Sequence, residues 1–146
     1  MEKTRKNLKT ISIVILIFAG LTLLGVIGEI CFGDLNKAEI PEGSPENILL
    51  ITKIFLLSLT VVLVLPQVYV GVKGIKFANA PDSSKAHIVW AIILFAFSVV
   101  TLISPLSAIF KGGDVFDNVS LMCSTIVEAV MFFEYVVTAR AVSKGK

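Results

Sequence analysis

Four long apolar segments dominate the chain and restrict what it can fold into. Each has 23 to 25 residues, and they cover residues 10–32, 48–72, 88–110 and 119–141. A helix needs about 20 apolar residues to cross the hydrocarbon core of a bilayer, because it rises about 1.5 Å per residue. Strands of a membrane barrel are about ten residues long and alternate in polarity, unlike these segments. The sequence predicts an all-α polytopic membrane protein with four transmembrane helices in an up-and-down bundle.

The composition excludes most soluble classes of protein. Of the 146 residues, 55% are hydrophobic and 16% are charged, and the mean hydropathy is +0.90. Soluble domains carry about 25% charged residues, so a soluble enzyme, a nucleic-acid-binding module and a disordered chain are all disfavoured. The first apolar segment exceeds the 7–15-residue core of a signal peptide and has no A-x-A-like site. We therefore expect residues 1–146 to form a single four-helix membrane domain.

The basic residues are unevenly divided between the two sides that the spans would define. Ten of the thirteen fall on the side of the termini and the middle loop, and three fall opposite them with six carboxylates. By the positive-inside rule, both termini are expected in the cytoplasm, with the protein in the plasma membrane of a bacterial cell. Near the middle loop, Lys73, Lys76 and Lys85 either contact anionic lipid headgroups or serve only to fix the topology.

Each apolar segment also carries a stripe of small or polar residues at helical spacing. The stripes are Ser12, Ala19, Thr22, Gly25 and Glu29; Lys53, Thr60, Gln67, Gly71 and Gly74; His87, Ser98, Thr101, Pro105 and Ala108; and Ser120, Ser124, Glu128, Met131, Tyr135 and Thr138, with Glu134 at the edge of the last. Small residues let helices approach closely and hydroxyl groups bond across the contact. The stripes are therefore expected to face one another, with Met122, Ala129 and Phe133 facing lipid.

Ionisable residues inside the spans are the candidates for function. Glu128 lies near the middle of the last span, where a charge costs about 2.5–3.5 kcal/mol on insertion scales. A low-dielectric surrounding favours the neutral acid, which can donate to a serine or threonine. Two roles therefore stay open for Glu128, a structural hydrogen-bonded acid and an acid that binds a proton or a cation. Glu29 and Lys53 either pair near the outer ends of adjacent helices or line a vestibule.

Other features of the sequence set further expectations. The second helix is expected to begin at Pro45 and to continue past the membrane to Ala78. Pro66 and Pro105 predict kinks, although broken helices also mark transport sites. Cys31 and Cys123 are expected to pack as small core residues rather than to form a disulfide. With one histidine, which we expect at the membrane interface, and no C-x-x-C pair, no catalytic residue, metal or cofactor is expected.

These observations leave two main functions open. The first is a structural or accessory membrane protein that self-associates or joins a membrane protein partner, without contact to nucleic acid. The second is a small channel or proton-coupled transporter with a polar site made of Glu128, Glu134, Glu29, Lys53, Gln67 and Tyr135. A single four-helix bundle has little room for a pore, so the second function predicts a homo-oligomer. A membrane-embedded enzyme has no nucleophile–base pair or metal cluster to support it.

Overall fold

The computed structural model describes residues 2–33, 47–81, 84–112 and 115–145, and the regular structure in these ranges is helical. The helices are α1 (Glu2–Phe32), α2 (Ile48–Asn79), α3 (Ala86–Thr101), α4 (Ile103–Phe110) and α5 (Val115–Lys144). Four segments are long and apolar enough to cross a membrane: α1, α2, α3 together with α4, and α5 from Asn118 onward. The prediction of an all-helical chain with four helices long and apolar enough to cross a membrane is thereby confirmed.

Three of the helices are longer than their apolar segments. α1 already begins at Glu2, α2 continues to Asn79, and α5 ends at Lys144. The added turns are polar but contain no proline, and the first proline after α2 is Pro81, which disfavours helical geometry in the residue before it. The predicted extension of the second helix is therefore correct. Its predicted start at Pro45 lies outside the described residues.

The third span is interrupted at Leu102, which separates α3 from α4. Pro105 accounts for the break, because it has no N–H to donate to the carbonyl of Thr101, and its ring crowds that carbonyl. The proline side chain is buried. Pro66, in contrast, lies inside α2, which is continuous from Ile48 to Asn79.

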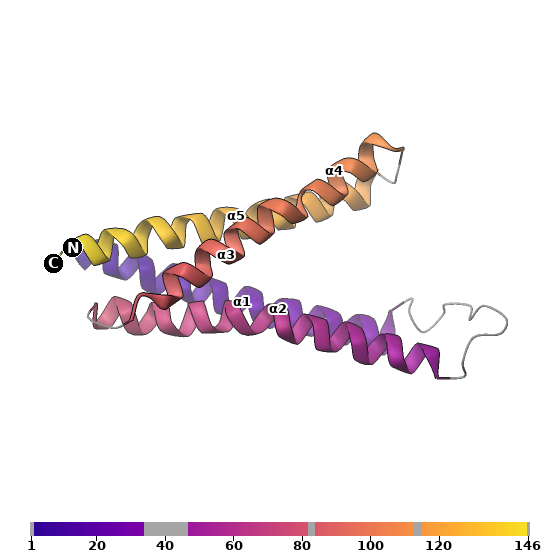
Figure 1. The fold of residues 1–146 in the computed structure, drawn as a ribbon, viewed down its shortest axis with the longest axis horizontal. Coiled ribbons are helices and arrows are strands. Elements are labelled where there is room, and N and C mark those ends of the chain that lie inside the picture. Colours follow the sequence, from indigo (N-terminus) through magenta and orange to yellow (C-terminus); the bar gives the residue numbers. More distant parts are fainter. Residues whose placement is uncertain (1, 34–46, 82–83, 113–114, 146) are drawn as a thin grey trace.

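The helices form two pairs arranged as a V (Figure 1). α1 packs along α2, and α5 packs along α3 and α4. The pairs meet at the end that holds both termini and the α2–α3 connection, which we call the closed end. They diverge toward the end marked by Phe32 and Phe110, which we call the open end. Instead of four helices in contact along their whole length, the protein is therefore a bundle only near its termini.

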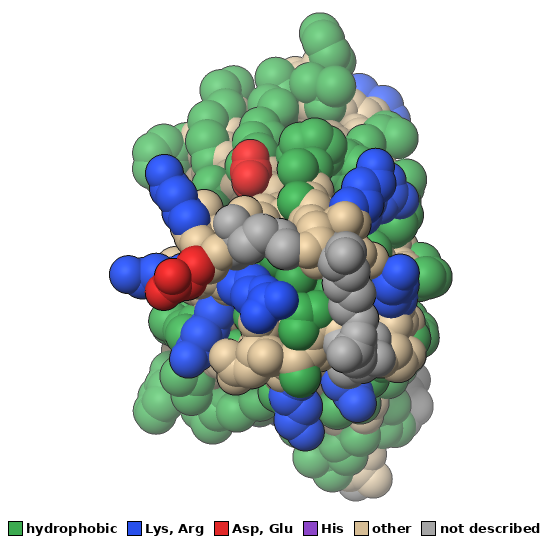
Figure 2. Space-filling view, turned by 90° about the vertical axis from the view of Figure 1, so that its left-hand side faces the viewer, with side chains coloured by type: hydrophobic (Ala, Val, Ile, Leu, Met, Phe, Trp, Pro, Cys, Tyr) green, Lys and Arg blue, Asp and Glu red, His purple; other side chains and the backbone are tan. Residues whose placement is uncertain are grey.

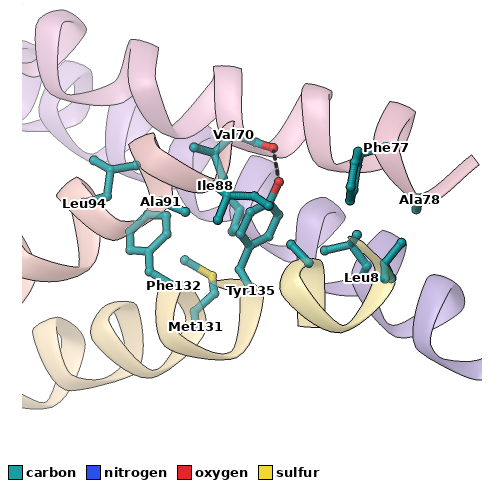
Figure 3. Close-up of a cluster of buried hydrophobic side chains, with 13 residues drawn as sticks. Leu8, Val70, Phe77, Ala78, Ile88, Ala91, Leu94, Met131, Phe132 and Tyr135 are labelled. Carbon is teal, nitrogen blue, oxygen red and sulfur yellow. Dashed lines mark hydrogen bonds between the residues drawn. The ribbon is translucent and has the colours of Figure 1, made fainter. Parts of the chain in front are cut away.

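The hydrophobic core fills the closed end (Figure 3). It consists of Leu8, Ile15, Val70, Phe77, Ala78, Ile88, Ala91, Leu94, Met131, Phe132, Tyr135, Ala139 and Val142. These residues come from the first half of α1, from Ile88–Leu94 of α3 and from the second halves of α2 and α5. Toward the open end, apolar side chains remain exposed, as Phe32 and Phe110 show with 88% and 83% of their surfaces accessible. Such side chains suit a lipid surrounding.

Two glycines of α2 allow the close contacts at the closed end. A Cβ atom on Gly71 would lie 2.6 Å from Cγ of Leu16, and one on Gly74 would lie 2.6 Å from the phenol oxygen of Tyr135 and also overlap the hydroxyl of Ser12. The absent side chains therefore let α2 touch both α1 and α5. This part of the small-residue stripe faces other helices as the sequence predicts.

The small-residue stripe of α1 differs from that of α2, because Gly25 and Glu29 at its far end do not pack against another helix. Among the described residues, no atom of another helix lies within 4 Å of a Cβ built on Gly25, and Glu29 is exposed. The expectation that these residues face another helix is wrong, because the pairs have separated at this level. Ala129, expected to face lipid, is instead only 7% exposed.

Candidate functional site

A polar crevice of about 290 Å³ lies between the helix pairs, next to the core on its open-end side. All four spans contribute to its wall, and seven of its twelve lining side chains are polar. The polar ones are Thr22, Thr60, Gln67, Ser98, Thr101, Thr125 and Glu128. The apolar ones are Val26, Leu63, Val64, Leu94 and Phe97. The crevice therefore gathers the intramembrane polar residues of four separate segments in one place.

A hydrogen bond between Gln67 and Glu128 joins the two pairs across the crevice. Nε2 of Gln67 donates to Oε1 of Glu128 at 2.7 Å, between residues 61 positions apart in the sequence. Gln67 is 8% exposed, and Glu128 is half-buried. An amide donor stabilises a carboxyl group that the bilayer would otherwise leave unsatisfied. The structure thus brings together two of the predicted site residues, the glutamine of α2 and the central acid of α5.

The five hydroxyl groups of the crevice share one hydrogen-bonding pattern. Each donates its proton to a carbonyl oxygen of its own helix, at 2.8 to 3.0 Å. The donors are Thr22, Thr60, Ser98, Thr101 and Thr125, and the acceptors are the carbonyls of Phe18, Leu56, Leu94, Ser98 and Leu121 respectively. A hydroxyl that has donated its proton has only lone pairs left. These groups therefore present acceptors.

The two remaining polar side chains add to this excess of acceptors. Gln67 contributes its carbonyl oxygen, and Glu128 contributes the carboxyl oxygen that Gln67 does not contact. No Lys, Arg or His is among the described residues that line the crevice. The donor capacity left over is the second N–H of Gln67, plus a proton on Glu128 when it is neutral. The crevice can therefore hold a group that carries donors or positive charge, and it disfavours anions.

Packed aromatic side chains lie on the closed-end side of the crevice. The hydroxyl of Tyr135 donates to the carbonyl of Val70 at 3.1 Å (Figure 3), and the whole side chain of Tyr135 is buried. His87, also buried, lies with its ring centroid 4.8 Å from that of Phe77 and 6.1 Å from that of Tyr135. This layer lies between the crevice and the closed end.

His87 also makes one polar contact within this layer. Its Nδ1 lies 2.9 Å from the carbonyl oxygen of Ser84, which fits a donated hydrogen bond from the neutral ring. Its Nε2 is buried and has no hydrogen-bond partner among the described residues. The histidine is therefore part of the packed layer rather than of the crevice wall.

The structure leaves four predicted site residues outside the crevice wall, and one of them, Tyr135, lies in the packed layer next to it. Glu134 is exposed on α5, away from the Glu128 face. Glu29 is exposed as well, with its carboxyl group folded against Gly33 at the end of its own helix. Lys53 is half-buried on α2. The proposed pairing of Glu29 with Lys53 stays a prediction.

The basic residues near the α2–α3 connection lie at the closed end, where Lys and Arg side chains gather (Figure 2). Lys85 lines a groove of about 480 Å³ between α3 and α5, with Arg140, Lys144, Ser143, Ile88, Val89 and Ile92. Lys76 is exposed, and Nζ of Lys73 lies 6.0 Å from the centre of the Tyr69 ring. Three cations beside an apolar wall suit an anionic headgroup with its acyl chain.

Sequence reasoning missed one polar residue of the crevice, Thr125, and the five apolar ones, which include Phe97. It placed Ser124 on the inward face of the last helix, but Ser124 is exposed and Thr125 lines the crevice. Thr125 lies three positions before Glu128 and therefore shares its face, which is the signal that could have identified it. Phe97 resembles any lipid-facing aromatic residue in the sequence, and only the divergence of the pairs exposes it to the crevice.

The two cysteines lie outside the crevice. Cys31 and Cys123 are free, as expected, but both are exposed instead of packed in the core. The described residues contain no group of three His, Cys, Asp or Glu side chains that could hold a metal ion. Comparison of the chain with protein-family models, with curated proteins and with solved structures found no match. The residues and contacts of the crevice are therefore the basis for the function proposed below.

Proposed function

We propose that this small integral membrane protein is a carrier that binds a polar solute between its helix pairs at Glu128. The supporting observation is the crevice, which is lined by polar side chains from all four spans, contains the Gln67–Glu128 hydrogen bond and lies between helix pairs that diverge toward one end (Figure 1). A polar cavity at membrane depth, bounded by helices and accessible from one side at a time, is what alternating access requires. A purely structural acid would be satisfied by contacts on all sides instead.

In this mechanism the solute enters from the open end and contacts Gln67, Glu128 and the hydroxyl groups. Release on the other side requires the packed layer around Tyr135 and His87 to separate while the open end closes. The basic residues at the closed end support an orientation in which that end faces the cytoplasm. The solute then enters from outside the cell.

A second candidate is a complex-forming subunit whose partner fills the V. The supporting observation is the exposed apolar surface along the divergent parts of the pairs, including Leu24, Ile27, Ile103 and Leu106. A transmembrane helix of the partner could place a donor side chain opposite Glu128. That side chain would then bond to the acceptors of the crevice in place of a solute. The two candidates differ in whether water reaches the crevice in the native membrane.

Cysteine labelling distinguishes them. In a variant with Cys31→Ser and Cys123→Ser, Thr101→Cys places a thiol in the crevice, and Val100→Cys places one on the exposed outer face next to it. A membrane-impermeant maleimide is then applied to vesicles of both orientations. A carrier predicts labelling at position 101 from one side only and protection at position 100.

The other outcomes are equally informative. Protection of position 101 in native membranes, with labelling after purification and reconstitution, would favour the complex-forming subunit. Protection under both conditions, from both sides, would mean that the crevice is dry and would refute the carrier.

A further inference from the structure

The balance of hydrogen-bonding groups in the crevice identifies a class of ligand. We propose that the crevice binds a small primary ammonium ion, that is, a protonated organic amine with a short apolar group. This inference rests on the proposed function of the crevice as a binding site. It goes further by fixing the charge, the hydrogen-bonding groups and the approximate size of the solute.

The hydroxyl groups provide the first argument. All five have donated their protons to backbone carbonyls at 2.8 to 3.0 Å, so a ligand meets their lone pairs. A ligand that itself offered only acceptors would leave these groups unpaired in a low-dielectric site. An ammonium group offers three N–H donors and no acceptor, which complements this wall.

The charge of the site provides the second argument. Glu128 is its one carboxyl group, and no basic side chain among the described residues lines the crevice beside it. A ligand with one positive charge therefore neutralises the ionised acid, whereas a divalent ion would leave a buried charge uncompensated. Gln67 already donates to Oε1, which leaves Oε2 for the ligand.

The shape and polarity of the wall favour an organic ion over a metal ion. Five of the lining side chains are apolar, and Phe97 presents an aromatic ring, which attracts an ammonium group placed over its face. A bare ion would need oxygen ligands in place of the five apolar side chains. The volume of about 290 Å³ lies at the lower limit of small-molecule pockets, so the apolar group is short.

Butylammonium is a suitable probe, and binding is measured by isothermal titration calorimetry on the full chain in nanodiscs at constant KCl. We expect saturable binding that weakens about tenfold or more in Glu128→Gln, the loss of about 1.4 kcal/mol that one charged contact supplies. The Gln side chain keeps the shape of Glu and can still bond to Gln67. Glu134→Gln is the matched control, because Glu134 is exposed on the same helix outside the crevice. It should bind like the unmodified chain.

Three further probes separate charge, donors and size. Butan-1-ol has the same chain without the charge, tetramethylammonium has the charge without N–H groups, and potassium is varied alone. The proposal predicts that all three bind at least about tenfold more weakly than butylammonium. Equal binding of butan-1-ol, equal binding of tetramethylammonium, or competition by millimolar potassium would each overturn it, as would equal affinity in the Glu128→Gln variant.

Failure of this inference can be told apart from failure of the carrier. If butylammonium does not bind while the thiol at position 101 is labelled from one side, the ammonium ligand is wrong and the carrier stands. If position 101 is protected in every condition, both are wrong.

Discussion

The phenol oxygen of Tyr135 lies 3.1 Å from the carbonyl oxygen of Val70, to which it donates a hydrogen bond. This contact joins α5 to α2 within the core, at the level where the two helix pairs meet (Figure 3). It passes beside Gly74, whose missing side chain leaves the space that the phenol occupies. The closed end therefore depends on a tyrosine and a glycine together.

Removal of the hydroxyl in Tyr135→Phe should destabilise the closed end modestly. Hydrogen bonds between membrane helices contribute about 0.6 kcal/mol on average and up to about 1.7 kcal/mol. We expect a loss in that range in the free energy of unfolding, measured by titration with SDS in mixed micelles. Thr10→Ala is the control, because its exposed hydroxyl bonds only to Lys6 of its own helix. A loss no greater than that of Thr10→Ala would contradict the role given to this contact.

A methyl group on Gly74 should be costly. In Gly74→Ala, the new Cβ overlaps the hydroxyl of Ser12 and the ring of Tyr135, so one of the helices must shift. Overpacking of this kind costs about 1–3 kcal/mol. Gly25→Ala is the matched control, because among the described residues no atom of another helix lies within 4 Å of its Cβ. It should be neutral or stabilise the helix by up to about 1 kcal/mol, because alanine is the better helix former. Equal stabilities of the two variants would show that α2 does not approach α5 this closely.

The hydrogen bond between Gln67 and Glu128 should appear as a coupling energy. In a double-mutant cycle with Gln67→Leu and Glu128→Leu, we expect the second substitution to cost less when the first is already present. The interaction energy should be about 0.5–2 kcal/mol, which is typical of residues in one network. The same SDS titration measures it. Additive effects within about 0.3 kcal/mol would indicate that the two side chains do not contact each other in the membrane.

Replacement of Pro105 should straighten the third span. Pro105→Ala restores an N–H that can bond to the carbonyl of Thr101. If a kink of about 20° is removed, the far end of the eight-residue α4 moves by about 4 Å, since the helix is about 12 Å long. Spin labels at positions 32 and 110, both exposed at the open end, would report this shift by electron-electron double resonance. Ser104→Ala, next to the proline, should leave the distance distribution unchanged.

The groove at the closed end should retain anionic lipid. Lys85→Gln combined with Arg140→Gln removes two of its three cations, each of which contributes about 1 kcal/mol near an anionic surface. We expect less phosphatidylglycerol to copurify, as counted by native mass spectrometry. Lys111→Gln is the control, because Lys111 lies at the open end. If both variants carry the same amount of lipid as the unmodified chain, the cations serve only to fix the topology.

Much of the fold follows from local sequence, because span length and proline chemistry are local properties. The four spans, the extension of α2 to Asn79 and the interruption near Pro105 could all be read from the residues themselves. The divergence of the pairs could not. A helical stripe shows which side of a helix is polar, but not whether another helix lies opposite it. Gly25 and Glu29 therefore continue the stripe of α1 without meeting a partner.

The two central residues of the candidate site could be predicted from the sequence, but the contact between them could not. Gln67 and Glu128 stand out because polar side chains are rare in spans of this kind. Their contact could not be predicted, because the polar stripe of one helix does not show which residue of another helix lies opposite it.

The V shape of the molecule has a mechanical consequence. The contacts that hold the pairs together lie around Ser12, Gly74 and Tyr135, whereas α1 extends another 20 residues to Phe32, or about 30 Å. The closed end is therefore a short pivot that carries two long lever arms. A rotation of about 10° at this pivot displaces the tip of an arm by about 5 Å, roughly half the diameter of a helix. The addition of one methyl group beside the pivot therefore produces a larger change in the distance between the two helix pairs at the open end.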